Sequence, residues 1–183
     1  LGVPRDGLIL DPFNGVGTTL LAADAMGIGS VGFDVNPVAV LASQVKNRSY
    51  SKQDLGDLRN LLREFNNEKP KPIDKPKYKS LPRIYSDEEL NDLLVIRAFV
   101  DGQSQDWAKK FFLLGFISIV EPVSNRIKDG NGIKIAKNKK PVEDIFGLFS
   151  SKISNMIEDL SSAPPAGLGT TIFGSLLSDA GFD

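Results

Sequence analysis

The sequence predicts an α/β fold in which parallel strands alternate with helices, interrupted by a long helical insertion. Two short apolar runs near the start each end at an acidic residue, and each is followed by a helical pattern. The middle of the chain is mostly helical in pattern, and a third β-rich run comes only near the end. We therefore expect a parallel sheet with strands over residues 8–13, 30–34 and 170–173.

The composition is that of a globular protein without thiols or imidazoles. Of 183 residues, 41% are hydrophobic and 25% charged, with a net charge of −1, which argues against disorder and against a generally basic nucleic-acid-coating protein. The absence of Cys and His excludes zinc fingers, thiol nucleophiles and Ser-His-Asp triads. The longest apolar run, residues 111–120, is about half the length of a membrane span. We expect no metal, no membrane and a cytoplasmic location.

The first fifty residues alternate between strand and helix patterns. A helical stretch from Thr18 stops at Gly27, and Pro37 occupies a first-turn position that starts the next helix. In that second helix, Val38, Leu41 and Val45 share one predicted face. This order of elements is typical of a parallel sheet.

The insertion is predicted to contain helices, an extended linker and a hairpin. Four prolines interleaved with lysines make residues 68–82 a solvated linker rather than a nucleic-acid arm. Ser86 begins a capping box, and a glycine-rich turn at residues 128–132 marks a hairpin tip. We expect helices over residues 54–65, 86–100, 106–120 and 141–160.

Two groups of side chains in the insertion have a possible role in nucleic-acid binding. The aromatic group, Trp107, Phe111 and Phe112, lies on an apolar helix and is predicted to be core rather than a base-stacking surface. The basic group follows the hairpin turn and either contacts phosphates or forms a solvated hairpin end; it consists of Lys134, Lys137, Lys139 and Lys140.

The turn Asn14-Gly15-Val16-Gly17 between the first strand and its helix is suited to an anionic ligand, and three ligand classes compete for it. A triphosphate loop requires a lysine after the last glycine, but Thr18 stands there. A dinucleotide fingerprint requires a third small residue, but Leu20 stands there. The third class is S-adenosylmethionine (SAM).

Residues 10–19, Leu-Asp-Pro-Phe-Asn-Gly-Val-Gly-Thr-Thr, resemble motif I of amino-group methyltransferases, Asp-Pro-Phe-x-Gly-x-Gly-Thr-Thr. Residues 32–37, Gly-Phe-Asp-Val-Asn-Pro, resemble the acidic motif at the end of the family's second strand. The chain thus resembles SAM-dependent DNA methyltransferases of the N4-cytosine/N6-adenine type. The resemblance implies a partial Rossmann-like SAM-methyltransferase fold, SAM as cofactor and DNA as partner.

The resemblance also implies a set of cofactor-binding residues. Gly15 and Gly17 would let the main chain approach the methionine portion of SAM, and Asp34 would accept its ribose hydroxyls. Ser175 stands where the family has an acid that binds the adenine amine, and Asp179 is the alternative. The full set is Asp11, Pro12, Phe13, Asn14, Gly15, Gly17, Thr18, Thr19, Asp34, Val35, Asn36 and Ser175. The structural alternative is that Asp11-Pro12 merely ends a strand and Asp34 merely caps the next helix.

The family's catalytic motif, Ser/Asp/Asn-Pro-Pro-Tyr/Phe, does not occur in the sequence. Ala163-Pro164-Pro165-Ala166 has the prolines but neither the polar nor the aromatic residue, so we interpret it as a loop. We therefore expect no catalytic residue in this chain and no activity of the chain alone. A second polypeptide or a missing C-terminal segment is expected to complete the sheet beside the first strand, which would otherwise be an apolar edge.

The predicted domain organisation follows from these patterns. Residues 1–50 and 163–183 are expected to form the partial SAM-binding core, and residues 51–162 a helical insertion for target recognition or closure. Two other functions stay open. One is an RNA methyltransferase acting on guanine N2 of tRNA, and the other is a non-catalytic module that binds SAM or a partner.

Overall fold

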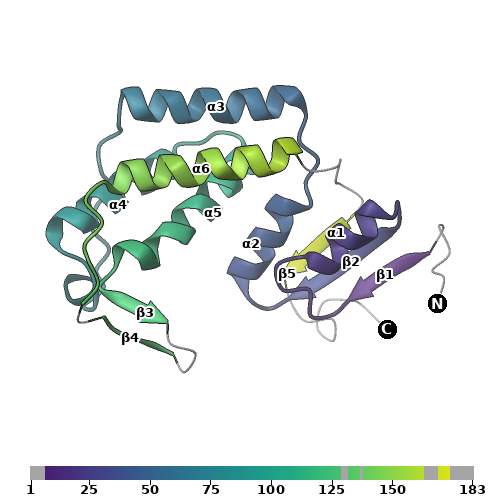
Figure 1. Ribbon diagram of the computed structural model, residues 1–183, viewed down its shortest axis with the longest axis horizontal. Coiled ribbons are helices and arrows are strands. Elements are labelled where there is room, and N and C mark those ends of the chain that lie inside the picture. The colour runs from purple at the N-terminus through teal and green to yellow at the C-terminus, as the bar shows by residue number, and fades with distance from the viewer. Residues whose placement is uncertain (1–6, 129–131, 137, 163–168, 174–183) are drawn as a thin grey trace. The chain divides into compact units, whose positions relative to one another are not determined.

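The computed structural model (Figure 1) describes residues 7–128, 132–136, 138–162 and 169–173, the last range by its backbone alone. The chain divides into two compact units. The first comprises Leu1–Leu55 with Asp159–Asp183, and the second comprises Gly56–Glu158. The roles assigned to the corresponding parts of the sequence stay predictions.

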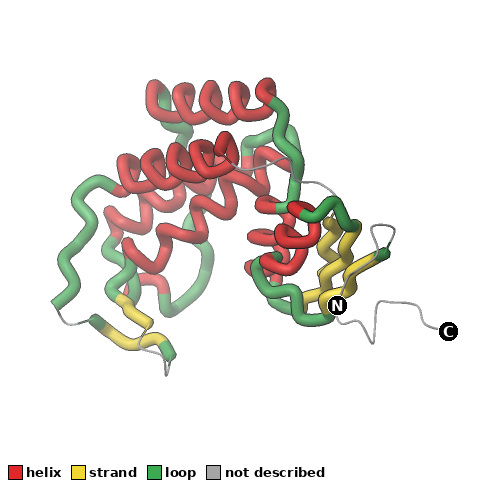
Figure 2. The backbone as a smooth tube through the Cα atoms, turned by 45° about the vertical axis from the view of Figure 1, so that its right-hand side comes forward, coloured by secondary structure: helices red, strands yellow, loops and turns green. Residues whose placement is uncertain are grey.

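The first unit is built on a three-stranded parallel sheet in the order β1-β2-β5, which confirms the predicted α/β fold (Figure 2). Helices α1 and α2 pack against it: α1 contacts all three strands, and α2 contacts β2 and β5. The elements are β1 (Leu8–Asp11), α1 (Thr18–Ala25), β2 (Gly29–Asp34), α2 (Pro37–Lys46) and β5 (Gly169–Phe173).

The first strand ends at Asp11, two residues before the predicted boundary at residue 13. Pro12 has no N–H to offer a sheet ladder. The Asp11 carboxylate accepts a hydrogen bond from the backbone N–H of Phe13 at 3.0 Å, which turns the chain away from the sheet. The strand therefore ends at Asp11, because the N–H of Phe13 bonds to the Asp11 side chain rather than to a neighbouring strand.

The predicted face of α2 is wrong in part. Val38 is 43% exposed, whereas Ala39, Val40, Ala42, Ser43 and Val45 are buried. The helix does begin at Pro37, because Asn36 caps it by accepting a hydrogen bond from the N–H of Val38 at 3.0 Å. Several of the buried side chains are small, so α2 can approach the sheet and the preceding loop closely.

A set of polar contacts joins residues between the end of α2 and the first residues of α3. Arg48 pairs with Asp54 at 3.2 Å, and the hydroxyl of Tyr50 donates to the carbonyl of Val45 at 3.1 Å. Burial raises the pKa of Tyr50 to about 12. Hydrogen bonds from the Ser51 backbone and from Arg48 lower the pKa of Asp54. These contacts hold together the residues from the end of α2 to Asp54.

The second unit contains the predicted helices and hairpin. The capping box at Ser86 is confirmed: its hydroxyl accepts from the N–H of Glu89 at 3.2 Å, and the Glu89 carboxylate accepts from the N–H of Ser86 at 2.7 Å. The elements are α3 (Lys52–Asn67), the 3₁₀ turn η1 (Leu81–Arg83), α4 (Asp87–Asp101), α5 (Asp106–Val123), β3 (Arg126–Lys128), β4 (Ile133–Ile135) and α6 (Ile145–Ser162).

Helix α6 begins at Ile145 rather than at the predicted residue 141. The cause is Asp144, whose carboxylate accepts from the N–H of Gly147 at 2.7 Å and whose carbonyl accepts from Leu148 at 3.0 Å. The buried face of this helix consists of Ile145, Phe149, Ile153 and Ile157, which recur at helical spacing.

Phenylalanines form the core of the second unit. Phe111 and Phe112 are fully buried, which confirms that they are core, whereas Trp107 is only half-buried. The ring of Phe65 lies 4.8 Å from that of Phe99 and 5.5 Å from that of Phe149, measured between ring centroids. Such tilted and edge-to-face pairs add to the free energy of burial.

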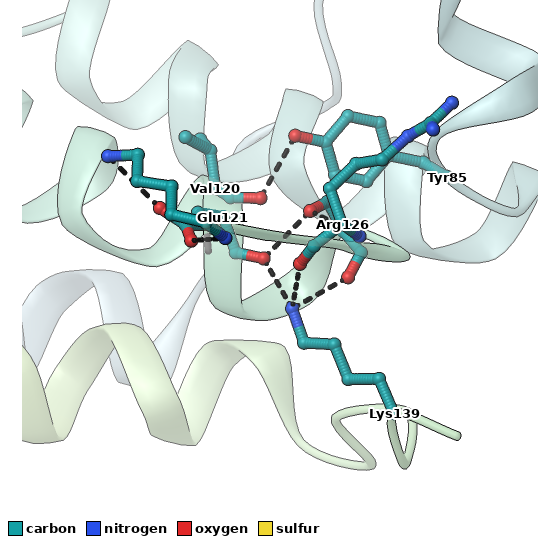
Figure 3. Close-up of polar contacts among 7 residues, drawn as sticks. Tyr85, Val120, Glu121, Arg126 and Lys139 are labelled. Atoms are coloured by element: carbon teal, nitrogen blue, oxygen red, sulfur yellow. Dashed lines mark hydrogen bonds and ion pairs between the residues drawn. The ribbon is translucent and has the colours of Figure 1, made fainter. Parts of the chain in front are cut away.

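Lys139 is a structural residue, which is neither of the roles left open for the basic group (Figure 3). Its ammonium donates to the carbonyls of Glu121, Ser124 and Arg126 at 2.6, 2.8 and 2.9 Å. The carbonyls at a helix C-terminus lack intrahelical partners, and a cation there also interacts favourably with the negative end of the helix dipole. Lys139 therefore ties the segment after the hairpin to the end of α5. Lys137 lies outside the described residues.

Candidate functional site

The loop formed by residues 12–17, here called the glycine loop, leads from β1 into α1 at the carboxyl end of the sheet. The N–H of Asn14 donates to the carbonyl of Phe33 in β2 at 2.9 Å, and the N–H of Gly17 donates to the carbonyl of Asn14 at 3.0 Å. In open parallel sheets, ligands bind outside this end of the strands. The glycine loop is thus positioned by β2 as well as by its own strand.

Asp34, the last residue of β2, joins the glycine loop to the turn before α2. Its Oδ2 atom accepts from the N–H of Gly15 at 2.7 Å, and its Oδ1 atom accepts from the N–H of Asn36 at 2.7 Å. An ionised carboxylate has about four lone-pair sites, so Asp34 retains acceptor capacity. The alternative in which Asp34 merely caps the next helix is wrong, because Asn36 is the cap.

Glycine suits the two positions of the loop, 15 and 17, for different structural reasons. Both have positive φ angles, +53° for Gly15 and +82° for Gly17, which residues with a Cβ atom rarely adopt. A Cβ atom on Gly15 would meet no atom within 4 Å, whereas one on Gly17 would collide with Ser43 and Asn47 of the α2 region. Gly15 therefore faces open space, and Gly17 permits close packing on α2.

The side chain of Asn14 is buried between the glycine loop, β2 and α2. Its side chain is 5% exposed, and its amide donates to the hydroxyl of Ser43 at 2.8 Å. It also lies so close to Gly32 that a Cβ atom on Gly32 would collide with it. The structure thus turns this predicted site residue toward the sheet and α2.

Sequence reasoning missed Ser43 and Asn47. Both are buried, and the amide of Asn47 donates to the carbonyl of Ser43 at 2.9 Å. Together they form the surface on which Gly17 rests. Two small polar residues four positions apart, among Ala and Val on the buried face of a helix, are the signal that could have found them.

Several other predicted site residues are exposed to solvent. Phe13 is 88% exposed and Val35 67% exposed, so an apolar side chain follows each of the two strand ends. Pro12, Thr18 and Thr19 are exposed as well, and Asp11 is half-buried. The N-cap of α1 is Gly17, with no side-chain capping bond. Ser175, Asp179 and the loop at residues 163–166 lie outside the described residues.

The site combines three recognition elements. The uncapped N-terminus of α1 offers N–H groups and a positive dipole end to an anion. Asp34 offers acceptor sites for hydroxyl groups, and the exposed side chains of Phe13 and Val35 offer apolar surface. In the part of the chain that the structure describes, no group of three or more Asp or Glu side chains is placed to hold a metal ion.

Comparison with known proteins relates part of the chain to a known family. A family described as DNA methylase matches residues 1–45, the range that contains β1, the glycine loop, β2 and most of α2. The type II methyltransferase M.BsoBI of Geobacillus stearothermophilus is 30% identical over 154 residues, which make up 78% of this chain and 30% of that protein. Residues 1–45 of the chain thus match the N6/N4 DNA methylase family. The resemblance found in residues 10–19 and 32–37 is thereby confirmed.

Two further relatives are also type II methyltransferases. The type II methyltransferase M.MjaII of Methanocaldococcus jannaschii is 42% identical over 62 residues, 32% of this chain and 12% of that protein. The type II methyltransferase M.MvaI of Kocuria varians is 27% identical over 125 residues, 64% of this chain and 28% of that protein. The chain spans less than a third of the length of these relatives. No solved structure gives a significant match, and no described helix is long and apolar enough to cross a membrane.

Proposed function

We propose that this chain is the SAM-binding part of a methyltransferase that transfers a methyl group from SAM to an exocyclic amino group of a DNA base, and that the glycine loop and Asp34 bind the SAM. The observation that carries the proposal is the 2.7 Å hydrogen bond from the N–H of Gly15 to Asp34. It brings a glycine turn and an acidic strand end, which are separate in the sequence, together at the carboxyl end of a parallel sheet.

The chemistry of SAM suits each part of this site. The ribose hydroxyls would donate to the remaining acceptor sites of Asp34, and the carboxylate of the methionine portion would face the N-terminus of α1. The open side of Gly15 leaves room for close approach to its backbone, and Phe13 and Val35 provide apolar surface for the adenine. SAM supplies the methyl group on an activated sulfonium; the residues of this chain hold and orient it.

DNA is the proposed substrate because the matching family is described as DNA methylase and the matching relatives are type II methyltransferases. These relatives do not favour the RNA methyltransferase or the non-catalytic module. We propose further that the family's catalytic motif, Ser/Asp/Asn-Pro-Pro-Tyr/Phe, lies outside these 183 residues, in the same protein or a second polypeptide. The insertion at residues 51–162 would then serve target recognition or closure.

Replacing Asp34 with alanine tests the cofactor site. The loss of charge-assisted hydrogen bonds to the ribose, about 1.5–3 kcal/mol, is expected to weaken SAM binding roughly 10- to 150-fold. Titration calorimetry with SAM on the wild-type and Asp34→Ala proteins measures this change, and circular dichroism checks that both are folded. An unchanged affinity would defeat the assignment of this carboxylate.

A ligand analogue separates direct contact from loosening of the loop, since Asp34 also holds Gly15 and Asn36. An analogue of SAM without ribose hydroxyls cannot donate to Asp34. We therefore expect it to bind wild-type and Asp34→Ala proteins with nearly equal affinity. If the substitution weakens both ligands by the same factor, Asp34 acts only by positioning the loop, and the ribose contact is wrong.

The free edge of β1 supports the proposal that a further strand completes the sheet. Among the described residues β1 pairs only with β2, and Leu8 and Leu10 on one face of it are 67% and 47% exposed. An apolar edge strand invites pairing with another chain. We propose that a segment outside these 183 residues or a second polypeptide covers this edge.

The isolated 183-residue chain is therefore expected to self-associate through β1. Size-exclusion chromatography with light scattering should give species larger than 19.9 kDa, and Leu10→Lys should reduce them because a charge on an edge strand opposes edge-to-edge pairing. Met26→Lys is the matched control, because Met26 is exposed in a turn after α1 that belongs to no strand. This substitution should leave association unchanged. A monodisperse wild-type monomer would contradict the proposal.

A further inference from the structure

The connection between α3 and α4 contains a strongly basic segment, residues 69–83, here called the lysine strap (Figure 1). It carries six cationic residues and one acid, a net charge of +5, whereas the whole chain has a net charge of −1. The remainder of the chain is therefore at −6. This charge separation within one small protein is the feature to be explained.

The lysine strap is anchored rather than loose. The ammonium of Lys69 lies 4.9 Å from the ring centroid of Phe146, and Lys75 pairs with Asp87 at the start of α4 at 2.6 Å. At the far end, the amide of Asn125 donates to the carbonyl of Arg83 at 3.0 Å. A flexible spacer needs none of these contacts, so the second unit holds the strap in a defined path.

Proline keeps the strap extended and its lysines outside. Four of its residues are prolines, which have no N–H for a helix or a sheet ladder and favour an extended chain. Residues 71–80 are all exposed. Among the described residues, Lys71, Lys77 and Lys79 form no ion pair. At about 3.1 Å per residue, these three lysines span up to about 25 Å.

We propose that the lysine strap binds the phosphate backbone of duplex DNA. A row of exposed, unpaired ammonium groups on an extended backbone complements a row of phosphates, because each contact releases counterions condensed on the DNA. Anchoring lowers the conformational entropy lost on binding, since the strap is already ordered. Such contacts position a protein on DNA without reading its sequence. The choice of DNA as the ligand rests on the proposed function. The net charge of the strap and the exposure of its lysines are observed independently of that function.

The triple variant K71Q/K77Q/K79Q tests the strap in the full-length protein. Fluorescence anisotropy with a duplex of about 20 base pairs gives the affinity at several salt concentrations. We expect the log–log salt slope to become shallower by about 0.9 for each lysine that binds a phosphate in the wild-type protein. If all three do so, the decrease in affinity between about 50 and 200 mM salt becomes about 40-fold smaller in the variant.

The matched control K46Q/K52Q/K152Q removes the same charge from three exposed lysines outside the strap. It should keep the wild-type slope, as should K71R/K77R/K79R, which keeps the charge on the strap. Equal slopes for the two glutamine triples would overturn the proposal, as would an effect confined to single-stranded RNA. SAM affinity measured on the same samples tests the proposed function separately, because no strap residue belongs to the cofactor site.

Discussion

Replacing Gly17 with alanine is expected to destabilise the first unit by about 2–5 kcal/mol. At its φ angle of +82° a residue with a Cβ atom is strained, and the added Cβ would also collide with Ser43 and Asn47. Both of these residues are buried, so they have little room to move. Urea unfolding followed by circular dichroism measures the loss, and SAM binding should be lost with the loop geometry.

Gly15→Ala is the matched control, because it adds the same methyl group at a position that faces open space. The φ angle of Gly15 is +53°, but its Cβ would meet no atom within 4 Å. We expect a loss of stability of only about 1 kcal/mol. If SAM occupies the open side, its affinity should nevertheless fall roughly 10-fold. Equal losses of stability in the two variants would show that backbone strain alone, rather than packing on α2, explains Gly17.

The sequence predicts the order of the elements well because their signals are local. The proline at the start of α2, the glycine after α1 and the capping box at Ser86 each act through their own backbone neighbours. The apolar face of α6 likewise follows from helical spacing alone. Two boundaries differ from the predicted ones at a carboxylate that accepts from a backbone N–H, that of Asp11 after β1 and that of Asp144 before α6.

The three-dimensional contacts of the candidate site could not be predicted in the same way. Whether a glycine faces open space or a neighbouring helix depends on packing between distant segments, and Gly15 and Gly17 differ in that respect. The motif draws attention to Asn14, but the pocket for its side chain is made by Gly32 and Ser43. Spacing along the chain does not report such contacts.

The contacts of charged residues are likewise not predictable from the sequence. Lys139 belongs to a basic group in the sequence, yet it holds three carbonyls near the end of α5. The composition of the lysine strap predicts a solvated linker, because composition does not reveal that the strap is anchored at Lys69, Lys75 and Arg83. The function of a charge depends on whether the fold gives it a partner.

Replacing Phe149 with alanine is expected to destabilise the second unit by about 3–5 kcal/mol. Its side chain is fully buried, and its ring lies 5.5 Å from that of Phe65 and 6.4 Å from that of Phe99, between centroids. Truncation leaves a cavity among side chains that are themselves fixed by edge-to-face packing. The midpoint of urea unfolding measures the loss.

Phe146→Ala is the matched control on the same helix. Phe146 is half-buried, and its ring lies 6.1 Å from that of Phe65 and 4.9 Å from the ammonium of Lys69. Because solvent can fill part of the space it leaves, we expect a loss of only about 1–2 kcal/mol. The difference between the two variants isolates the contribution of full burial. If Phe146→Ala is as destabilising as Phe149→Ala, the aromatic core extends to the surface where Lys69 begins the strap, and the strap then contributes to the stability of the second unit.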